Sequence, residues 1–201
     1  MLFVISGPSG CGKSTLVKRV LNELDEVEFS VSYTTRKKRE TEKEGKDYFF
    51  ISEREFKRLI REDKLTEWAV VHENYYGTPK REFEKKTGGR DLLLDIDVQG
   101  ATQVKEKVKK AVFIFILPPL FPELKKRLEE RSQEHKEAIN RRLEVAKREI
   151  RHYYQFDYII INDRLDKAAE ELKAVILNQR CRTEVRKKEI LPILRSFSGE
   201  D

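Results

Sequence analysis

The sequence predicts an α/β protein with a parallel β-sheet, helices on both of its faces, an inserted mixed α+β lobe and a helical lid. First, short apolar runs are bounded by polar or turn residues, which is typical of strands buried on both faces. Second, segments with helical periodicity alternate with these runs, and that alternation favours parallel strands. Third, a glycine-rich segment separates the first apolar run from the first periodic segment, as in phosphate-binding loops.

The core elements follow one another along the 201-residue chain. Ligands of such sheets bind where the parallel strands end, so we expect a site near the first strand and after the second. The predicted strands are residues 2–5, 92–96, 111–117 and 158–161, and the predicted helices are residues 15–24, 99–107, 120–131, 139–153 and 167–180.

Residues 32–87 interrupt this alternation and form the predicted lobe, whereas residues 1–31 and 88–201 form the core. Aromatic and β-branched segments at 29–33, 48–51, 65–71 and 74–78 indicate short antiparallel strands around one helix at 53–61. A polar stretch at 132–138 lies between two arginine-rich helical segments and predicts a moving flap, part of a lid at about 121–142. The tail carries a short amphipathic piece at 185–194, interrupted by Pro192.

The chain is rich in charged residues, and its net positive charge would also suit a nucleic-acid-binding protein. Charged residues make up 39% of the chain and the formal net charge is +6, but both signs alternate along the helices, as on solvated surfaces. No run approaches the roughly 18 apolar residues of a membrane span, and no signal peptide is recognisable. The two cysteines, Cys11 and Cys181, indicate neither a disulfide framework nor a metal site. We therefore expect a cytoplasmic protein with no membrane or nucleic-acid partner, either a monomer or a homo-oligomer.

The glycine-rich segment fits the pattern G-x-x-x-x-G-K-[ST] of loops that bind nucleoside triphosphates. Glycines let several backbone N–H groups converge on a polyanion, and the following helix start favours negative charge. We expect Lys13 to reach the β- and γ-phosphates of the bound nucleotide and the Ser14 hydroxyl to bind Mg²⁺. The predicted nucleotide-binding residues of this phosphate loop are Gly7, Pro8, Ser9, Gly10, Cys11, Gly12, Lys13, Ser14 and Thr15.

A second anion site is predicted in the inserted lobe. Arg36 and Arg39 lie three residues apart among hydroxyl side chains, and Tyr48 and Tyr76 follow. Guanidinium forks and phenol hydroxyls suit a compact phosphate, because they donate in fixed directions and form short charge-assisted bonds. The alternative is that both arginines form surface pairs with neighbouring glutamates, at 40 or 42.

The order and spacing of five further motifs resemble those of guanylate kinases, from the phosphate loop to about residue 180. The resemblance implies transfer of the γ-phosphoryl group of ATP to GMP, giving ADP and GDP, by in-line transfer when the lobes close. It makes residues 32–87 a GMP-binding lobe. The motifs are Ser32-Tyr33-Thr34-Thr35-Arg36-x-x-Arg39, Asp47-Tyr48-Phe49-Phe50, Glu67-Trp68-Ala69, Asn74-Tyr75-Tyr76-Gly77-Thr78 and Leu94-Asp95-Ile96-Asp97-x-Gln99-Gly100.

At the matching positions, the resemblance implies a clamp for the GMP phosphate and a set of guanine readers. A carboxylate at Glu67 can accept from guanine N1–H and the 2-amino group together, whereas adenine presents an unprotonated N1. Such a site can reject the wrong base by roughly 10⁴-fold. The clamp residues are Arg36, Arg39, Tyr48 and Tyr76, and the guanine readers are Ser32, Glu67 and Thr78. Gly77 is a further predicted GMP-binding residue.

Asp97 ends a predicted buried strand, where a carboxylate needs a cation or a hydrogen-bond partner. We expect it to hold Mg²⁺ through water or to contact GMP, with Asp95 as the second choice. Positioned cations should supply most of the acceleration, because in-line transfer spreads negative charge over the γ-phosphoryl oxygens. Lys13 and Arg39 are the predicted catalytic cations outside the lid.

The resemblance also implies lid arginines and an adenine contact. Arg131 and Arg142 resemble the lid arginines of the family, and such a residue can contribute 10³ to 10⁵ in rate in related chemistry. For Arg127 and Arg141 two interpretations remain: lid cations that reach the phosphates, or ordinary charges on a helix surface. Asn162 resembles the residue that contacts adenine.

The sequence departs from the family pattern at two places. The segment at 38–41 replaces a Pro-Arg-Pro-Gly-type turn, and the segment at 132–135 replaces small hydroxyl and glycine residues. A non-catalytic interaction module of the same fold is the main alternative, but the complete phosphate loop and both arginine sets argue against it. A GTPase or a nucleic-acid translocase would need switch or recognition segments that the sequence does not show.

Overall fold

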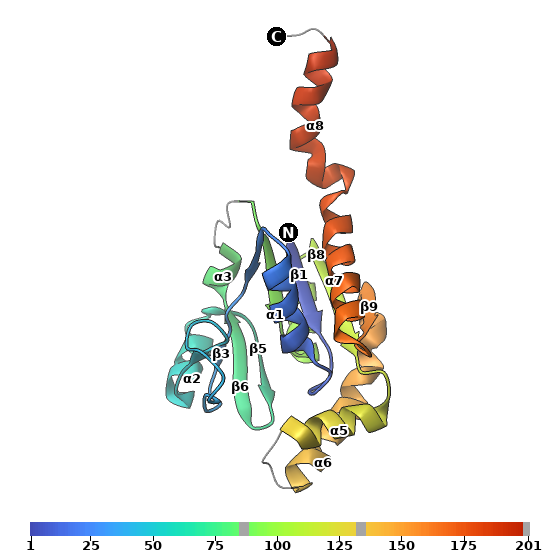
Figure 1. Ribbon diagram of the computed structural model, residues 1–201. Helices are drawn as coiled ribbons and strands as arrows, with labels where there is room; N and C mark the ends of the chain where they lie inside the picture. The colour runs from blue at the N-terminus through green and yellow to red at the C-terminus, as the bar shows by residue number, and fades with distance from the viewer. Residues whose placement is uncertain (85–88, 132–135, 199–201) are drawn as a thin grey trace.

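The computed structural model describes residues 1–84, 89–131 and 136–198. In this part of the chain a five-stranded parallel sheet forms the core, with strand order β2-β7-β1-β8-β9 (Figure 1). The predicted fold class is therefore confirmed. The strands are β1 Leu2–Ser6, β2 Val27–Phe29, β7 Asp91–Asp95, β8 Ala111–Leu117 and β9 Tyr158–Ile161.

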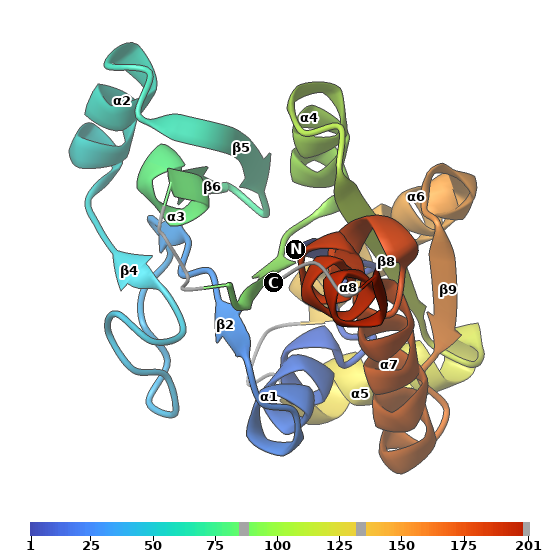
Figure 2. The same cartoon turned by 90° about the horizontal axis from the view of Figure 1, so that it is seen from above.

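Helices cover both faces of this sheet, as Figure 2 shows. On one face, α1 (Lys13–Glu23) and α7 (Leu165–Arg180) pack against alternate strand residues such as Phe3 and Ile5. On the other face, α4 (Val98–Lys107) packs against the intervening residues, Val4 among them. Successive strand side chains point to opposite faces, so two apolar layers are buried at once.

A second sheet, with strand order β4-β3-β6-β5, forms the lobe beside the core. The expected segments form strands, but β3 and β4 pair in parallel and not antiparallel, because residues 35–48 carry the chain back before Phe49 joins Tyr33. The expected strand at 29–33 is divided: Val27–Phe29 extends the core sheet, which the prediction missed, and β3 begins at Tyr33. The lobe comprises β3 Tyr33–Thr34, β4 Phe49–Phe50, α2 Glu53–Arg61, β5 Leu65–Val71, β6 Asn74–Pro79 and α3 Lys80–Glu84.

The region predicted as a lid contains α5 (Phe121–Arg131) and α6 (Lys136–Glu149), which share a small apolar core that includes Leu128 and Leu143. The predicted helix at 139–153 divides into α6 and a 3-10 helix, η1 (Ile150–Gln155). Of the predicted flap, residues 132–135 lie outside the described residues, and residues 136–138 begin α6.

The last helix, α8 (Thr183–Ser198), extends away from the rest of the molecule (Figure 1). The amphipathic piece predicted at 185–194 is thus part of one longer helix, and Pro192 lies inside it. Its side chains are almost all exposed, including Phe197 at 86%. None of the helices in the described ranges has the length and apolar character needed to cross a membrane.

Candidate active site

The phosphate loop connects β1 to α1 in a conformation that only glycine fits at its key positions. Gly7, Gly10 and Gly12 have φ values of 144°, 88° and 93°, in the region that side chains disfavour. A Cβ on Gly7 would lie 2.2 Å from the carbonyl oxygen of Ile116, and one on Gly12 would lie 2.3 Å from Nδ2 of Asn162. The glycines therefore let the loop backbone curve closely around the space at the start of α1, where the helix dipole favours a polyanion.

Lys13 is held against this loop. Its Nζ donates to the carbonyl oxygens of Gly7, at 2.6 Å, and Pro8, at 3.4 Å. Burial alone would lower the pKa of Lys13, but Cys11 and the carboxylates of Asp95 and Glu149 raise it above the ordinary value. The ammonium group is therefore charged and lies among acceptors that a triphosphate can replace.

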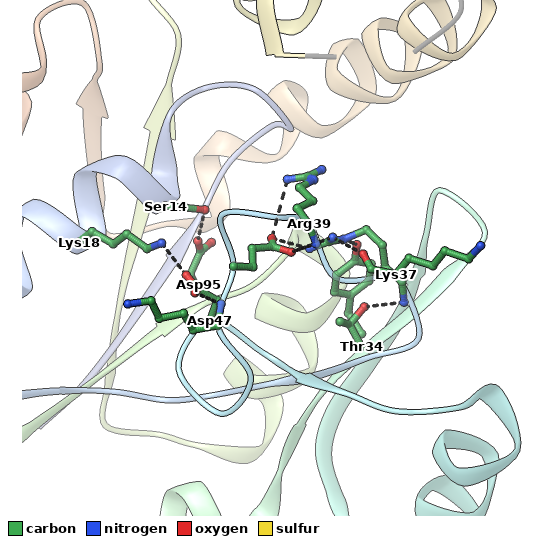
Figure 3. Close-up of polar contacts among 11 residues, drawn as sticks. Ser14, Lys18, Thr34, Lys37, Arg39, Asp47 and Asp95 are labelled. Carbon is green, nitrogen blue, oxygen red and sulfur yellow. Dashed lines mark hydrogen bonds and ion pairs between the residues drawn. The ribbon is translucent and has the colours of Figure 1, made fainter. Parts of the chain in front are cut away.

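Two carboxylates follow β7, and the structure gives them different partners. Asp95 Oδ2 accepts from the Ser14 hydroxyl at 3.3 Å, a pair that Figure 3 shows between α1 and the end of β7. Asp97 caps α4 and accepts from the backbone N–H groups of Gln99 and Gly100, both at 3.1 Å. Burial raises the pKa of both carboxyls. The geometry thus favours Asp95 over Asp97 as the carboxylate beside the predicted Mg²⁺ position.

The three predicted guanine readers form one buried hydrogen-bonded chain. Glu67 Oε1 accepts from the Thr78 hydroxyl at 2.5 Å, and this hydroxyl lies 2.9 Å from the Ser32 hydroxyl. Glu67 is only 2% exposed, and burial raises its pKa to about 7. A Cβ on Gly100 would lie 2.5 Å from Glu67 Oε2, so the start of α4 closes the pocket against this carboxylate. Gly77, a further predicted GMP-binding residue, lines the same cavity as Glu67.

The predicted phosphate clamp is assembled around Arg36. Its Nε donates to the Tyr76 hydroxyl at 3.2 Å, and its guanidinium lies over the ring of Tyr48, 5.6 Å from the centroid. Burial also raises the pKa of Tyr48 well above its ordinary value. Arg36 pairs with Glu42 at 2.7 Å, as the surface-pair alternative expected, but only 16% of its side chain is exposed. Arg39 is 59% exposed and lies 3.9 Å from the same carboxylate.

The clamp loop is also linked to the core. Lys18 on α1 forms an ion pair with Asp47 at 2.5 Å, shown in Figure 3. Asp47 Oδ2 accepts from the backbone N–H of Lys43 at 2.8 Å. The helix that follows the phosphate loop thereby fixes one end of the segment that carries the arginines.

The structure brings only some of the predicted lid and adenine-contact residues to the cavity. Arg142 lines the same cavity as the phosphate loop, whereas the side chain of Arg131, the last residue of α5, lies outside the described part. Arg127 donates to the carbonyl oxygen of Asn162 at 3.0 Å. Asn162 in turn donates from Nδ2 to the carbonyl oxygen of Cys11 at 2.8 Å, so it supports the phosphate loop from behind. The adenine contact of Asn162 stays a prediction. Arg141 lines the gap between lid and lobe.

Two acids in the cavity were missed by the sequence analysis as functional residues. Glu149, at the end of α6, has a pKa raised to about 7, chiefly by burial, although Lys13 lowers it. Glu42 was considered only as a surface partner of the arginines. The local sequence signal for both is weak, because each is an acid in a highly charged segment and is placed by tertiary packing.

One cavity of about 210 Å³ joins all three groups: the phosphate loop, the arginine clamp and the buried carboxylate pocket. Within the described residues, no group of three or more acidic, histidine or cysteine side chains could hold a metal ion alone. A hydroxyl and one carboxylate beside a triphosphate are nevertheless a common Mg²⁺ environment, because the nucleotide supplies further oxygens. A phosphate loop that faces a guanidinium-based anion site across one cavity defines the protein as a P-loop kinase of small phosphorylated substrates.

Comparison with known proteins specifies the family. The guanylate kinase family model matches residues 1–179. A guanylate kinase of Geobacter sulfurreducens is 50% identical over 184 residues, 91% of each chain, and one of Caldanaerobacter subterraneus is 46% identical over 195 residues, 96% of this chain and 94% of the relative. The solved guanylate kinase of Anaplasma phagocytophilum superposes with a TM-score of 0.76 at 32% identity, covering 94% of this chain and 95% of its own. The chain belongs to the guanylate kinase family.

Proposed function

We propose that this protein transfers the γ-phosphoryl group of ATP to GMP, giving ADP and GDP. The observation that carries the proposal is the single cavity in which a phosphate loop faces an arginine clamp, with a buried carboxylate beside the clamp. Family membership supports the same reaction. Both substrates are small nucleotides, so the reaction involves no nucleic acid and no membrane.

The donor side is built on the phosphate loop. The backbone N–H groups at the start of α1 and the ammonium of Lys13 bind the β- and γ-phosphates of ATP. The residues present fit a Mg²⁺ ion, because the Ser14 hydroxyl and Asp95 lie 3.3 Å apart beside the loop. When bound, the ion would be held by the Ser14 hydroxyl and the Asp95 carboxylate and would neutralise the charge that develops during transfer.

The acceptor side orients GMP toward the donor. Arg36, Arg39, Tyr48 and Tyr76 bind its phosphate, and Glu67 accepts from N1–H and the 2-amino group of the base. Thr78 keeps one oxygen of Glu67 in place through its 2.5 Å bond. The distance between the base pocket and the clamp then sets the position of the attacking phosphate oxygen.

The lid completes the site when both nucleotides are bound. Arg142 already lines the cavity, and we propose that Arg131 joins it from the end of α5 as the lid closes. Closure brings positive charge to the transferred group and excludes water, so the phosphoryl group passes to GMP and is not hydrolysed.

A coupled assay of ADP formation with purified protein tests this proposal. We expect turnover with GMP and at least 10³-fold lower kcat/KM with AMP, CMP and UMP. Lys13→Met should abolish turnover while leaving GMP binding measurable by calorimetry. Binding of GMP without any transfer in the wild-type protein would instead support the non-catalytic module.

A further inference from the structure

The arginine clamp contains a carboxylate that the proposed reaction does not use. Glu42 accepts from Nη1 of Arg36 at 3.0 Å and from Nη2 at 2.7 Å, and also from the backbone N–H of Arg39 at 2.9 Å. Its side chain is 12% exposed, so the pair is largely withdrawn from water. Figure 3 shows the dashed contacts of this network beside Arg39.

The pairing leaves one edge of Arg36 for a ligand. A guanidinium has five N–H donors in a rigid plane. Nε donates to the Tyr76 hydroxyl, one hydrogen of Nη1 to the carbonyl oxygen of Lys37, and one hydrogen of each Nη to Glu42. Within the described residues the second Nη2 hydrogen remains, on the edge that Nη2 shares with Nε and the Tyr76 hydroxyl.

Glu42 also shapes the turn that departs from the family pattern. The backbone N–H of Glu42 donates to the carbonyl oxygen of Arg39 at 3.1 Å, while its carboxylate accepts from the N–H of Arg39. These two bonds close the turn at 39–42, where the resemblance leads one to expect proline and glycine. A single side chain thus holds both the guanidinium of Arg36 and the backbone of Arg39.

We propose that Glu42 is a positioning residue of the clamp. It holds Arg36 and Arg39 in place and leaves the second Nη2 hydrogen of Arg36, beside the Tyr76 hydroxyl, for the GMP phosphate. The inference rests on the proposed function. Glu42 and the phosphate then bind different edges of one guanidinium and do not compete for it. Arg36 is ordered before GMP arrives, so less side-chain freedom is lost on binding.

The direction in which Glu42→Gln changes the Kd of GMP shows whether Glu42 positions Arg36 or competes with the phosphate for it. Glu42→Gln keeps an acceptor but loses the bidentate charged pair. We expect the Kd of GMP, measured by calorimetry, to rise about tenfold, because charge-assisted bonds that fix Arg36 are lost. The Kd of guanosine, which lacks the phosphate, should stay unchanged. In kinetics, KM for GMP should rise while kcat and KM for ATP stay within about twofold. Glu40→Gln, at an exposed position of the same loop, controls for the loss of one negative charge.

Three results would overturn the proposal. Tighter binding of GMP to Glu42→Gln would mean that the carboxylate competes with the phosphate. Equal losses for GMP and guanosine would mean that the lobe has been distorted. In an Arg36→Lys background, Glu42→Gln should have little further effect, so additive losses would show that Glu42 does not act through Arg36. Failure of the wild-type protein to bind GMP would refute the proposed function itself, before any variant is made.

Discussion

Replacing Glu67 by glutamine should convert a guanine site into an unselective one. The carboxylate has two acceptors for the two donors of the guanine edge, and Thr78 already donates to one of its oxygens at 2.5 Å. In Glu67→Gln, the amide oxygen takes the position beside Thr78, and the NH₂ group faces a guanine N–H. Two hydrogen-bond donors then face each other. Because residue 67 is only 2% exposed, water cannot supply the missing acceptor.

The magnitude follows from the bonds that change. One charge-assisted hydrogen bond, worth about 1.5 to 3 kcal/mol, is lost, and one buried donor becomes unsatisfied. Together these cost about 3 kcal/mol, or a factor of about 150 in kcat/KM for GMP. For AMP, the amide can donate to the unprotonated N1, so kcat/KM should rise.

The assay is the ratio of kcat/KM for GMP to that for AMP, in the wild type, in Glu67→Gln and in Glu53→Gln, whose acid lies on the surface of α2. The melting temperature of Glu67→Gln should not fall, because a buried acid is replaced by a neutral group of the same shape. A GMP preference that stays within about threefold of the wild type would refute the assignment of Glu67.

Three further predictions concern protonation, metal and backbone. Because burial raises the pKa of Glu67 to about 7, the affinity for guanosine, measured by calorimetry, should rise about tenfold from pH 6 to 8. In Glu67→Gln the affinity should not depend on pH in this range. The same raised pKa should make the unliganded fold less stable in thermal melts as the pH rises from about 4.5 to 7. Asp95→Asn should raise the Mg²⁺ concentration needed for half-maximal turnover severalfold, whereas Asp97→Asn should leave it unchanged; the reverse order would restore Asp97 as the metal carboxylate. Gly12→Ala should abolish ATP binding in calorimetry, whereas Gly89→Ala, with a similar φ of 96° but nothing within 4 Å, should cost only about 1 kcal/mol in denaturant unfolding.

The sequence predicted those parts of the fold whose signals are local. The phosphate loop carries its glycines at fixed spacing, so its place between β1 and α1 was predicted, although α1 begins two residues earlier than expected. Strand β8 is one apolar run and was located to the residue. Strand β2 was missed because Val27–Phe29 is short, carries a glutamate and pairs only at the edge of the sheet.

The order of the two aspartates shows where sequence reasoning about the site ends. Asp95 and Asp97 both follow a buried strand, and the sequence alone ranked Asp97 first. Asp97 begins a helix and satisfies its oxygens with helix N–H groups, a local cap signal that could have been recognised. The contact between Asp95 and Ser14 joins residues 81 apart in the chain and depends on the parallel pairing of β1 with β7. Glu42 and Glu149 likewise reach the cavity only because a loop and a lid helix pack over it.

Helix α8 has a practical consequence. It is a 16-residue segment with almost no packing partner in the described chain, and Pro192 removes one of its internal amide donors. The backbone amides of α8 should exchange with deuterium far sooner than those of α7, and opening of α8 should leave the catalytic cavity unaltered. The segment is therefore the natural place for a fluorophore, an affinity label or a surface tether that leaves phosphoryl transfer undisturbed.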